Sequence, residues 1–110
     1  MRIEWSDHAV SDLKAISEYI EQDRSLDTAN RVTRAIYDAI RSLQDMPYRG
    51  RYGRVENTRE LAVSRLPYLA VYEVLKDRVV ILNIVHGARR WPRFAAGILP
   101  SRTARGEADV

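Results

Sequence analysis

The spacing of apolar residues changes along the chain and divides it into a helical half and a strand half. Polar and apolar residues alternate over residues 2–5, which predicts a short strand. Beyond it, apolar residues recur at steps of three and four and predict two amphipathic helices, the first ending near Asp23. Ser6 is placed to cap the first helix, and either Ser25 or Asp27 to cap the second. Because the link between them is very short, we expect an antiparallel helical hairpin.

In the second half a period of two replaces the helical period. Pro47 and Gly50 end the second helix, and residues 49–54 are expected to form an arginine-rich loop. Alternation and apolar runs then predict three strands, at residues 58–63, 68–75 and 79–85, of which the last two form a hairpin. The order β-α-α-β-β-β indicates an α+β fold, with the helical hairpin on one face of a small antiparallel sheet. We expect the opposite face to be concave and partly open.

Length and composition indicate one soluble domain. Because 110 residues suffice for a single core, we expect one domain at 1–92, followed by an arginine-containing C-terminal tail at 93–110. No apolar run is long enough to span a membrane, and no secretory signal pattern opens the chain. We therefore expect a cytoplasmic protein with no membrane partner. With no cysteine and two histidines, no metal site or organic cofactor is expected.

The basic charge is carried almost entirely by arginine. Sixteen arginines stand beside two lysines, and the net charge is +3. One interpretation is a genome biased toward arginine codons. The other is a surface for an anionic partner, because guanidinium is a flat fork suited to phosphates and carboxylates. The candidate binding residues for such a partner are Arg49, Arg51, Arg54, Arg65, Arg89, Arg90 and Arg93.

Residues in the predicted strands carry candidate chemistry, each with a structural alternative. His86 ends a buried strand and serves either as a general acid or base or as a packed structural residue. Arg59 and Glu60 are adjacent in a strand, so their side chains point to opposite faces and cannot act as an acid–base pair. Since Arg59 shares its face with apolar residues, we expect a partly covered arginine that stabilises the fold through a carboxylate partner.

Tyrosines near the arginine-rich loop offer a second kind of surface. Tyr68 and Tyr72 lie on one face of a strand, and with Tyr52 nearby they are candidates for stacking on nucleic-acid bases. The alternative is packing in the core, which we expect for Tyr72 at least.

Four segments, in this order on the β-α-α-β-β-β pattern, resemble the RelE/ParE toxin superfamily over residues 1 to about 93. They are Pro47-x-x-Gly50-Arg51, Thr58-Arg59-Glu60-Leu61, Pro67-Tyr68-Leu69-Ala70-Val71-Tyr72 and Val80-Ile81-Leu82-x-Ile84-Val85-His86-Gly87-x-Arg89-x-Trp91-Pro92. The resemblance implies the toxin half of a type II toxin–antitoxin pair, an addiction module of the plasmid-stabilisation type. It also implies a cognate antitoxin as partner in a toxin–antitoxin hetero-oligomer.

The superfamily divides by target. RelE-like members cut mRNA in the ribosome, whereas ParE-like members poison DNA gyrase and show no nuclease activity. RelE-like enzymes place lysines and an arginine along the second and third sheet strands, and the matching positions here look like Glu60, Ala62 and Leu69. Arg89 matches an arginine that RelE-like enzymes use after the last strand, but no tyrosine follows Tyr72. The missing cations favour the ParE-like, non-nuclease interpretation.

We therefore expect a ParE-like growth inhibitor that poisons DNA gyrase and is neutralised by its antitoxin. The first alternative is a RelE-like, ribosome-dependent mRNA endonuclease, whose candidate catalytic residues would be Arg59, His86 and Arg89. The second alternative is a nontoxic nucleic-acid-binding domain that has kept the fold.

Overall fold

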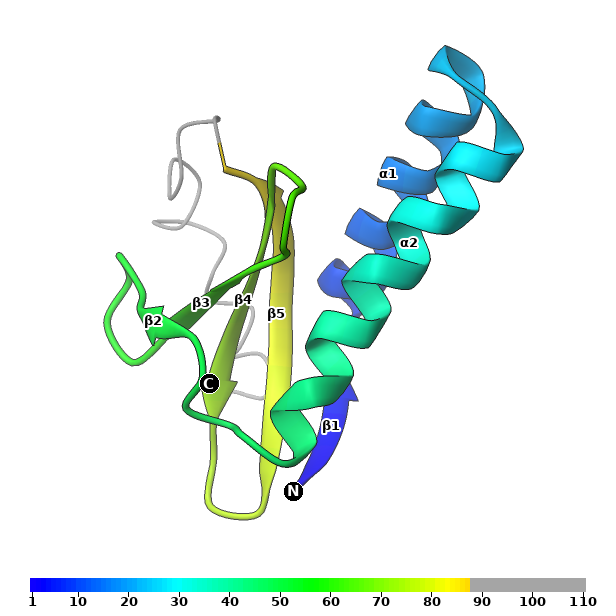
Figure 1. The fold of residues 1–110 in the computed structure, drawn as a ribbon. Helices are drawn as coiled ribbons and strands as arrows, with labels where there is room; N and C mark the ends of the chain where they lie inside the picture. Colours follow the sequence, from blue (N-terminus) through cyan, green and yellow to red (C-terminus); the bar gives the residue numbers. More distant parts are fainter. Residues whose placement is uncertain (88–110) are drawn as a thin grey trace.

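The chain folds into a helical hairpin beside a five-stranded sheet (Figure 1). The structure is a computed structural model, and it describes residues 1–87. Its elements are β1 (Arg2–Trp5), α1 (Asp7–Asp23), α2 (Leu26–Arg41), the 3-10 turn η1 (Ser42–Gln44), β2 (Arg51–Tyr52), β3 (Arg59–Ala62), β4 (Tyr68–Val74) and β5 (Arg78–His86). The predicted order of strand, two helices and strands is confirmed, whereas the predicted tail at 93–110 lies outside the described residues.

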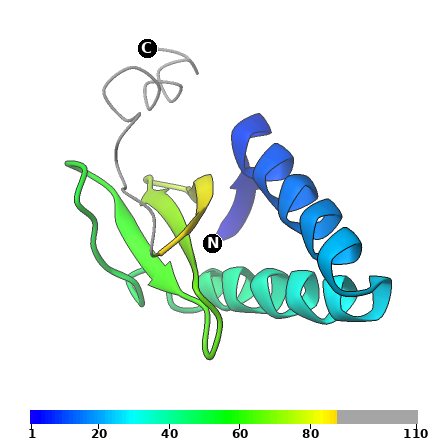
Figure 2. The same ribbon diagram turned by 90° about the horizontal axis from the view of Figure 1, so that it is seen from above.

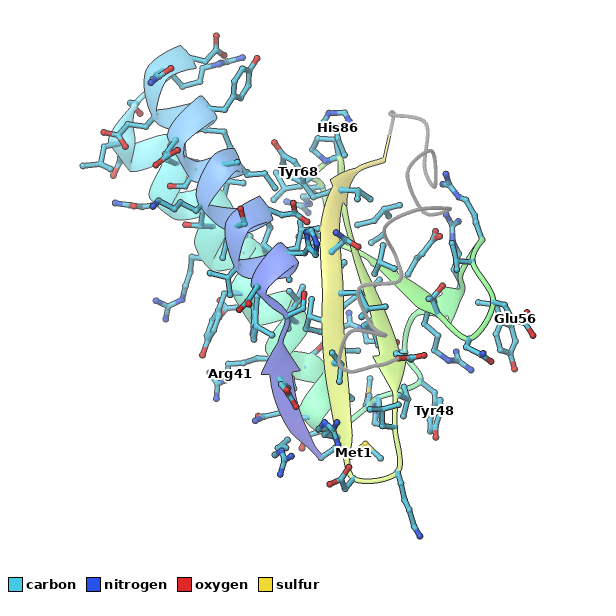
Figure 3. The ribbon with its side chains drawn as sticks, turned by 180° about the vertical axis from the view of Figure 1, so that it is seen from behind. Met1, Arg41, Tyr48, Glu56, Tyr68 and His86 are labelled. Carbon is cyan, nitrogen blue, oxygen red and sulfur yellow. The ribbon has the colours of Figure 1, made fainter. Side chains whose placement is uncertain are left out.

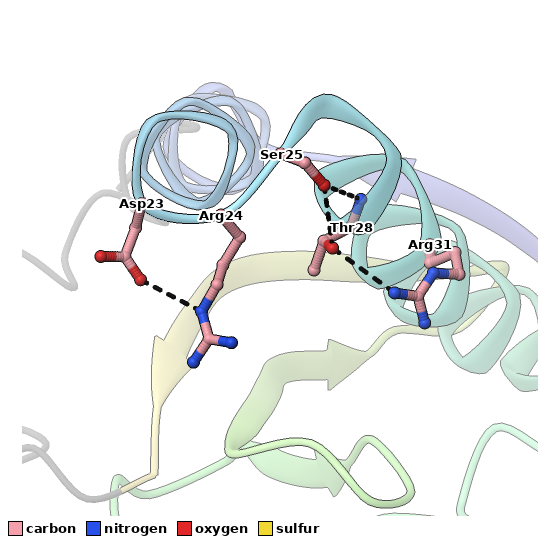
Figure 4. Close-up of polar contacts among 5 residues, drawn as sticks. All are labelled: Asp23, Arg24, Ser25, Thr28 and Arg31. Carbon is pink, nitrogen blue, oxygen red and sulfur yellow. Dashed lines mark hydrogen bonds and ion pairs between the residues drawn. The ribbon is translucent and has the colours of Figure 1, made fainter.

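Serine side chains fix the starts of both helices. The hydroxyl oxygen of Ser6 accepts a hydrogen bond from the N–H of Ala9 at 3.0 Å. At the turn between the helices, the hydroxyl oxygen of Ser25 accepts one from the N–H of Thr28 at 3.0 Å (Figure 4). Ser25, rather than Asp27, is therefore the cap of α2, and Asp27 lies in its first turn. Such caps satisfy N–H groups that have no partner within the helix.

The sheet differs from the expected one at both edges. Its strand order is β1-β5-β4-β3-β2, with β1 parallel to β5 and the other pairs antiparallel. The predicted small antiparallel sheet is thus confirmed for β2 to β5. The four-residue strand β1 adds a parallel pairing with β5 that the prediction did not specify. The predicted arginine-rich loop at 49–54 contains a two-residue strand that was not predicted, since Arg51 and Tyr52 pair with Glu60 and Arg59.

Both helices lie on one face of the sheet, where the main core forms (Figure 2). Ile36 and Ile40 of α2 and Leu43 of η1 are buried there, and Tyr72 and Ile81 face them from β4 and β5. These five side chains are shielded from water because each layer buries the apolar side of the other. In the described part of the chain, no helix is both long and apolar enough to cross a membrane.

The face turned away from the helices is less open than expected. Alternation along β4 places Leu69 and Val71 on it, and Val71 is fully buried. The neighbouring Glu60 of β3 is also buried, whereas Ala62 at the end of that strand is exposed. This face is therefore covered at Val71 and Glu60 and open at Ala62.

Candidate functional site

The chain between η1 and β3, at residues 45–58, wraps around one buried hydroxyl. Tyr72 is fully buried, and its hydroxyl donates to the carbonyl oxygen of Pro47 and accepts from the N–H of Gly50, both at 2.8 Å. A side chain at residue 50 would place its Cβ 2.7 Å from this hydroxyl oxygen and 2.8 Å from the carbonyl oxygen of Glu60. Only glycine fits so close an approach, so the sequence around residue 50 positions the loop firmly.

Arg59, which pairs with Tyr72 across β3 and β4, contacts the same segment. Its Nη1 donates to the carbonyl oxygen of Gly50 at 2.7 Å and to that of Tyr48 at 3.3 Å. Its guanidinium carbon lies 5.0 Å from the centre of the Tyr48 ring and 4.5 Å from that of Tyr52. Among residues 1–87 its expected carboxylate partner is not found. The side chain faces carbonyl oxygens and aromatic rings, and the carboxylate of Glu60 points to the opposite face of the sheet.

Glu60 neutralises part of the arginine-rich loop. Its carboxylate, with no exposed surface, lies 3.2 Å from Nη2 of Arg51 and 3.7 Å from Nε of Arg54. It also accepts a hydrogen bond from the backbone N–H of Arg54 at 3.0 Å. Buried carboxylates require such partners, since an unpaired buried charge is strongly unfavourable. Arg51 and Arg54, predicted as binding residues, therefore also serve the fold.

The remaining predicted binding arginines lie in different settings. Nη1 of Arg49 donates to the hydroxyl of Ser42 at 2.6 Å. Because a hydroxyl is uncharged, this contact does not neutralise the positive charge of the guanidinium. Arg65 is exposed in the β3–β4 turn and forms no ion pair with any described residue. Three further candidates lie outside the described residues: Arg89, Arg90 and Arg93.

The candidate catalytic residues of the nuclease alternative do not converge in the described structure. Arg59 pairs across the sheet with Tyr72, and His86 with Tyr68, whose ring it meets edge to face at 5.6 Å (Figure 3). Four residues of one strand separate the two tyrosines, which corresponds to about 13 Å. Arg59 and His86 therefore occupy separate regions, and the third candidate, Arg89, lies outside the described residues.

The strand positions that match cations of RelE-like enzymes lie together on the helix-free face. Ala62 pairs directly with Leu69, and Glu60 precedes Ala62 by two residues. These positions present a carboxylate, a methyl group and an isobutyl group where cations would be needed for a phosphate. Arg51 and Arg54 reach this region from β2 and the turn after it, but they meet the carboxylate of Glu60 there.

A shallow pocket, which the sequence did not predict, opens beside Arg59. It has a volume of about 320 Å³ and is lined by Tyr48, Tyr52, Arg59, Val74 and residues of the turn 53–58. In Figure 3, Tyr48 and Glu56 lie at the side of the molecule that carries β2. A sequence signal for it did exist, since two tyrosines flank Gly50 in an arginine-rich segment, but only the fold brings Arg59 between them.

A second polar cluster joins α1 to the edge of β5. β1 pairs with β5 only as far as Ile81, so within residues 1–87 the rest of β5 has a free edge on that side. There, Asp12 Oδ2 accepts hydrogen bonds from the N–H of Ile84 at 2.9 Å and from Nδ2 of Asn83 at 3.2 Å. Burial raises the pKa of the Asp12 carboxyl above its ordinary value, although these two bonds and the charge of His8 oppose the shift. The carboxylate thus completes hydrogen bonds of the sheet edge. Among residues 1–87, no group of histidine, aspartate and glutamate side chains is suited to hold a metal ion.

Comparison with known proteins agrees with this architecture. Residues 3–91 match the family described as "ParE toxin of type II toxin-antitoxin system, parDE". "Putative toxin Y4kP" of Sinorhizobium fredii is 39% identical over 92 residues, 84% of this chain and 94% of that protein. "Toxin RelE2" of Caulobacter vibrioides is 38% identical over 88 residues, 80% of this chain and 97% of that protein.

The fold matches a solved structure of the same kind. A chain in the structure titled "Chromosomal ParDE TA system from P. aeruginosa" superposes with a TM-score of 0.75 and 26% identity, covering 78% of this chain and 95% of that one. The family match over nearly the whole of the described structure, the two curated relatives and this superposition agree. The chain belongs to the ParE toxin family of type II toxin–antitoxin systems, within the RelE/ParE superfamily.

Proposed function

We propose that this protein arrests cell growth as a DNA gyrase poison and that a cognate antitoxin neutralises it in the cytoplasm. The observation that carries the choice of target is Glu60. A buried carboxylate stands where a RelE-like nuclease would need a cation, and it pairs with the two guanidiniums that reach that face. A phosphate of mRNA would be repelled by the carboxylate and would have to compete for those arginines.

The proposed antitoxin supplies an acidic segment that folds on the toxin surface. The solved relative belongs to a ParDE system, and the net charge of +3 on this chain suits an anionic partner. Arg49 and Arg65, which form no ion pair with described residues, are available to such a segment. Folding on binding would let a short, flexible antitoxin segment cover a large part of the toxin.

A supercoiling assay tests the target directly. Purified protein, added to DNA gyrase at micromolar concentration, is expected to block supercoiling and to trap cleaved DNA. Prior addition of the antitoxin encoded beside the toxin gene is expected to restore supercoiling. Full gyrase activity in the presence of a protein that still arrests growth would reject gyrase as the target.

The nuclease alternative is retained because one relative, 38% identical, is named "Toxin RelE2". Primer extension on mRNA from induced cells distinguishes it. Discrete cuts within translated codons, absent before induction, would support ribosome-dependent cleavage. Growth arrest without such cuts would exclude it, and unaffected growth would instead favour a nontoxic nucleic-acid-binding domain.

A further inference from the structure

The pocket beside β2 is bordered by two exposed tyrosines, whose rings both contact the guanidinium of one arginine. We call Tyr48, Arg59 and Tyr52 the tyrosine–arginine cluster. The side chains of Tyr48 and Tyr52 are 62% and 82% exposed, yet both rings lie within 5.0 Å of the guanidinium of Arg59. Burial in the core cannot explain the positions of these residues, since both are largely exposed.

The cluster is held in place by groups beneath it. The buried hydroxyl of Tyr72 fixes the chain on both sides of Tyr48, at Pro47 and Gly50. After Tyr52 the chain turns back through a hydrogen bond of 2.8 Å from the N–H of Gly53 to the carbonyl oxygen of Thr58. A partner would therefore meet a preorganised surface and would lose little affinity to the ordering of this loop.

The chemistry of the cluster is that of a protein-binding surface. Tyrosine and arginine are enriched among the residues that dominate binding energy at interfaces. Both hydrogen bonds of Arg59 are donated by Nη1, so its Nε and Nη2 have no acceptor among the described residues. These two N–H groups present the fork that pairs with a carboxylate, and the adjoining pocket of about 320 Å³ has room for an apolar side chain.

The surrounding charges favour an acidic peptide over a nucleic acid. Arg49, Arg51 and Arg54 lie in the same loop as the cluster, which makes its surroundings positive. However, Glu56 lines the pocket, and Arg51 and Arg54 share the carboxylate of Glu60. A chain of phosphates needs a continuous track of cations, whereas a single carboxylate next to an apolar group needs only Arg59 and the tyrosine rings.

We propose that the tyrosine–arginine cluster is a docking site for the antitoxin. An acidic segment of that protein places one carboxylate on Arg59 and a neighbouring apolar or aromatic side chain against Tyr52, in the pocket. This inference rests on the proposed function, because it takes the partner to be the neutralising antitoxin. It assigns the antitoxin a contact at the β2 edge of the sheet, away from the closed end of the helical hairpin (Figure 1).

Affinity for the antitoxin, measured by calorimetry on purified variants, tests the site. Tyr52→Ala removes the most exposed ring, and it is expected to weaken binding about ten-fold or more. Tyr52→Phe keeps the ring and is expected to bind as the unmodified protein does. Tyr19→Ala is the matched control: Tyr19 is 66% exposed on α1, and its loss should change affinity less than about two-fold.

Growth arrest by the same variants separates this inference from the proposed function. Retained toxicity with weakened antitoxin binding in Tyr52→Ala supports the docking site. Unchanged antitoxin affinity in that variant overturns it. If Tyr52→Ala loses toxicity or single-stranded oligonucleotide binding while it still binds antitoxin normally, the cluster faces the target instead. Failure of the unmodified protein both to arrest growth and to bind the antitoxin would reject the proposed function itself, and the partner with it.

Discussion

At the scale of single residues, the structure depends on buried polar groups that meet specific hydrogen-bond partners. Tyr72 illustrates this: burial raises the pKa of its hydroxyl, although the hydrogen bond from Gly50 and the nearby charges of Arg59 and Arg49 oppose the shift. The hydroxyl therefore stays protonated near neutral pH and can donate to Pro47. Its fit to the loop leaves no space for a larger residue at position 50.

Gly50→Ala is expected to destabilise the protein by about 1–3 kcal/mol, because the added methyl group meets the hydroxyl of Tyr72 and the carbonyl oxygen of Glu60. Gly87→Ala is the control, since its added Cβ would lie no closer than 3.4 Å to the carbonyl oxygen of Pro67. We expect that change to alter stability by less than about 0.5 kcal/mol. Urea denaturation of the two variants measures the difference, and equal stabilities would show that the loop adapts at Gly50.

The sheet-edge carboxylate of Asp12 predicts a pH dependence. Its pKa is raised in the folded state, so the folded protein binds this proton more tightly than the unfolded chain does. The stabilisation is present below the usual aspartate pKa and is lost as the pH rises through the raised value. Asp12→Asn keeps an oxygen acceptor for Ile84 and removes this titration. Its free energy of unfolding should therefore increase relative to that of the unmodified protein as the pH rises through the acid range.

Asp12→Ala tests the hydrogen bonds of the same side chain. Unlike Asp12→Asn, it leaves the N–H of Ile84 without its acceptor. Because neither variant titrates at this position, Asp12→Ala should be less stable than Asp12→Asn by about 1–3 kcal/mol at every pH. Chemical denaturation between pH 3 and pH 7 separates the two effects. A stability difference between Asp12→Asn and the unmodified protein that does not change with pH would contradict the raised pKa.

At the scale of elements, local signals predicted well and long-range pairings did not. The helical hairpin was predictable because its periodicity and its caps, Ser6 and Ser25, involve residues within one turn of each other. The parallel pairing of β1 with β5 joins Trp5 to Ile81, and no local pattern specifies which distant strand a four-residue segment will join.

The candidate site was predictable only as a set of residues. The arginine-rich loop and Arg59 stood out in the sequence, but the partner of Arg59 depends on the path of the loop above the sheet. Alternation placed Arg59 and Glu60 on opposite faces correctly, yet it could not show that the loop would bring carbonyl oxygens to one and guanidiniums to the other.

The cap of α2 gives a test at this scale. Ser25→Ala removes the hydroxyl that accepts from Thr28 and is expected to destabilise the protein by about 1 kcal/mol. Asp27→Ala removes only a favourable charge in the first turn and should cost about 0.3–1 kcal/mol at low salt. Thermal unfolding in low and high salt compares them. A larger loss for Asp27→Ala, persisting in high salt, would show that Asp27 takes the capping role in solution.

At the scale of the whole molecule, the hairpin and the loop form two separate surfaces. The closed end of the hairpin stands away from the sheet, whereas the arginine-rich loop lies at the opposite, β2 edge (Figure 1). This separation follows from the strand order, because β2 lies at the sheet edge opposite β1. It also places Arg59 at one region of the sheet and His86, which pairs with Tyr68, at another.

That separation predicts the effect of His86 on activity. If the protein inhibits growth by binding, His86→Ala should arrest growth as fully as the unmodified toxin, because inhibition by binding involves no proton transfer at the end of β5. A nuclease that uses His86 as general acid or base would instead lose about 10²–10⁴-fold of its cleavage rate. His86→Gln is the companion variant, since it keeps a polar side chain at the end of β5. Induced growth curves measure activity, and antitoxin binding and the melting temperature show that each variant is folded. Loss of growth arrest in both folded variants would restore the nuclease interpretation, because binding alone does not require a proton donor at that position.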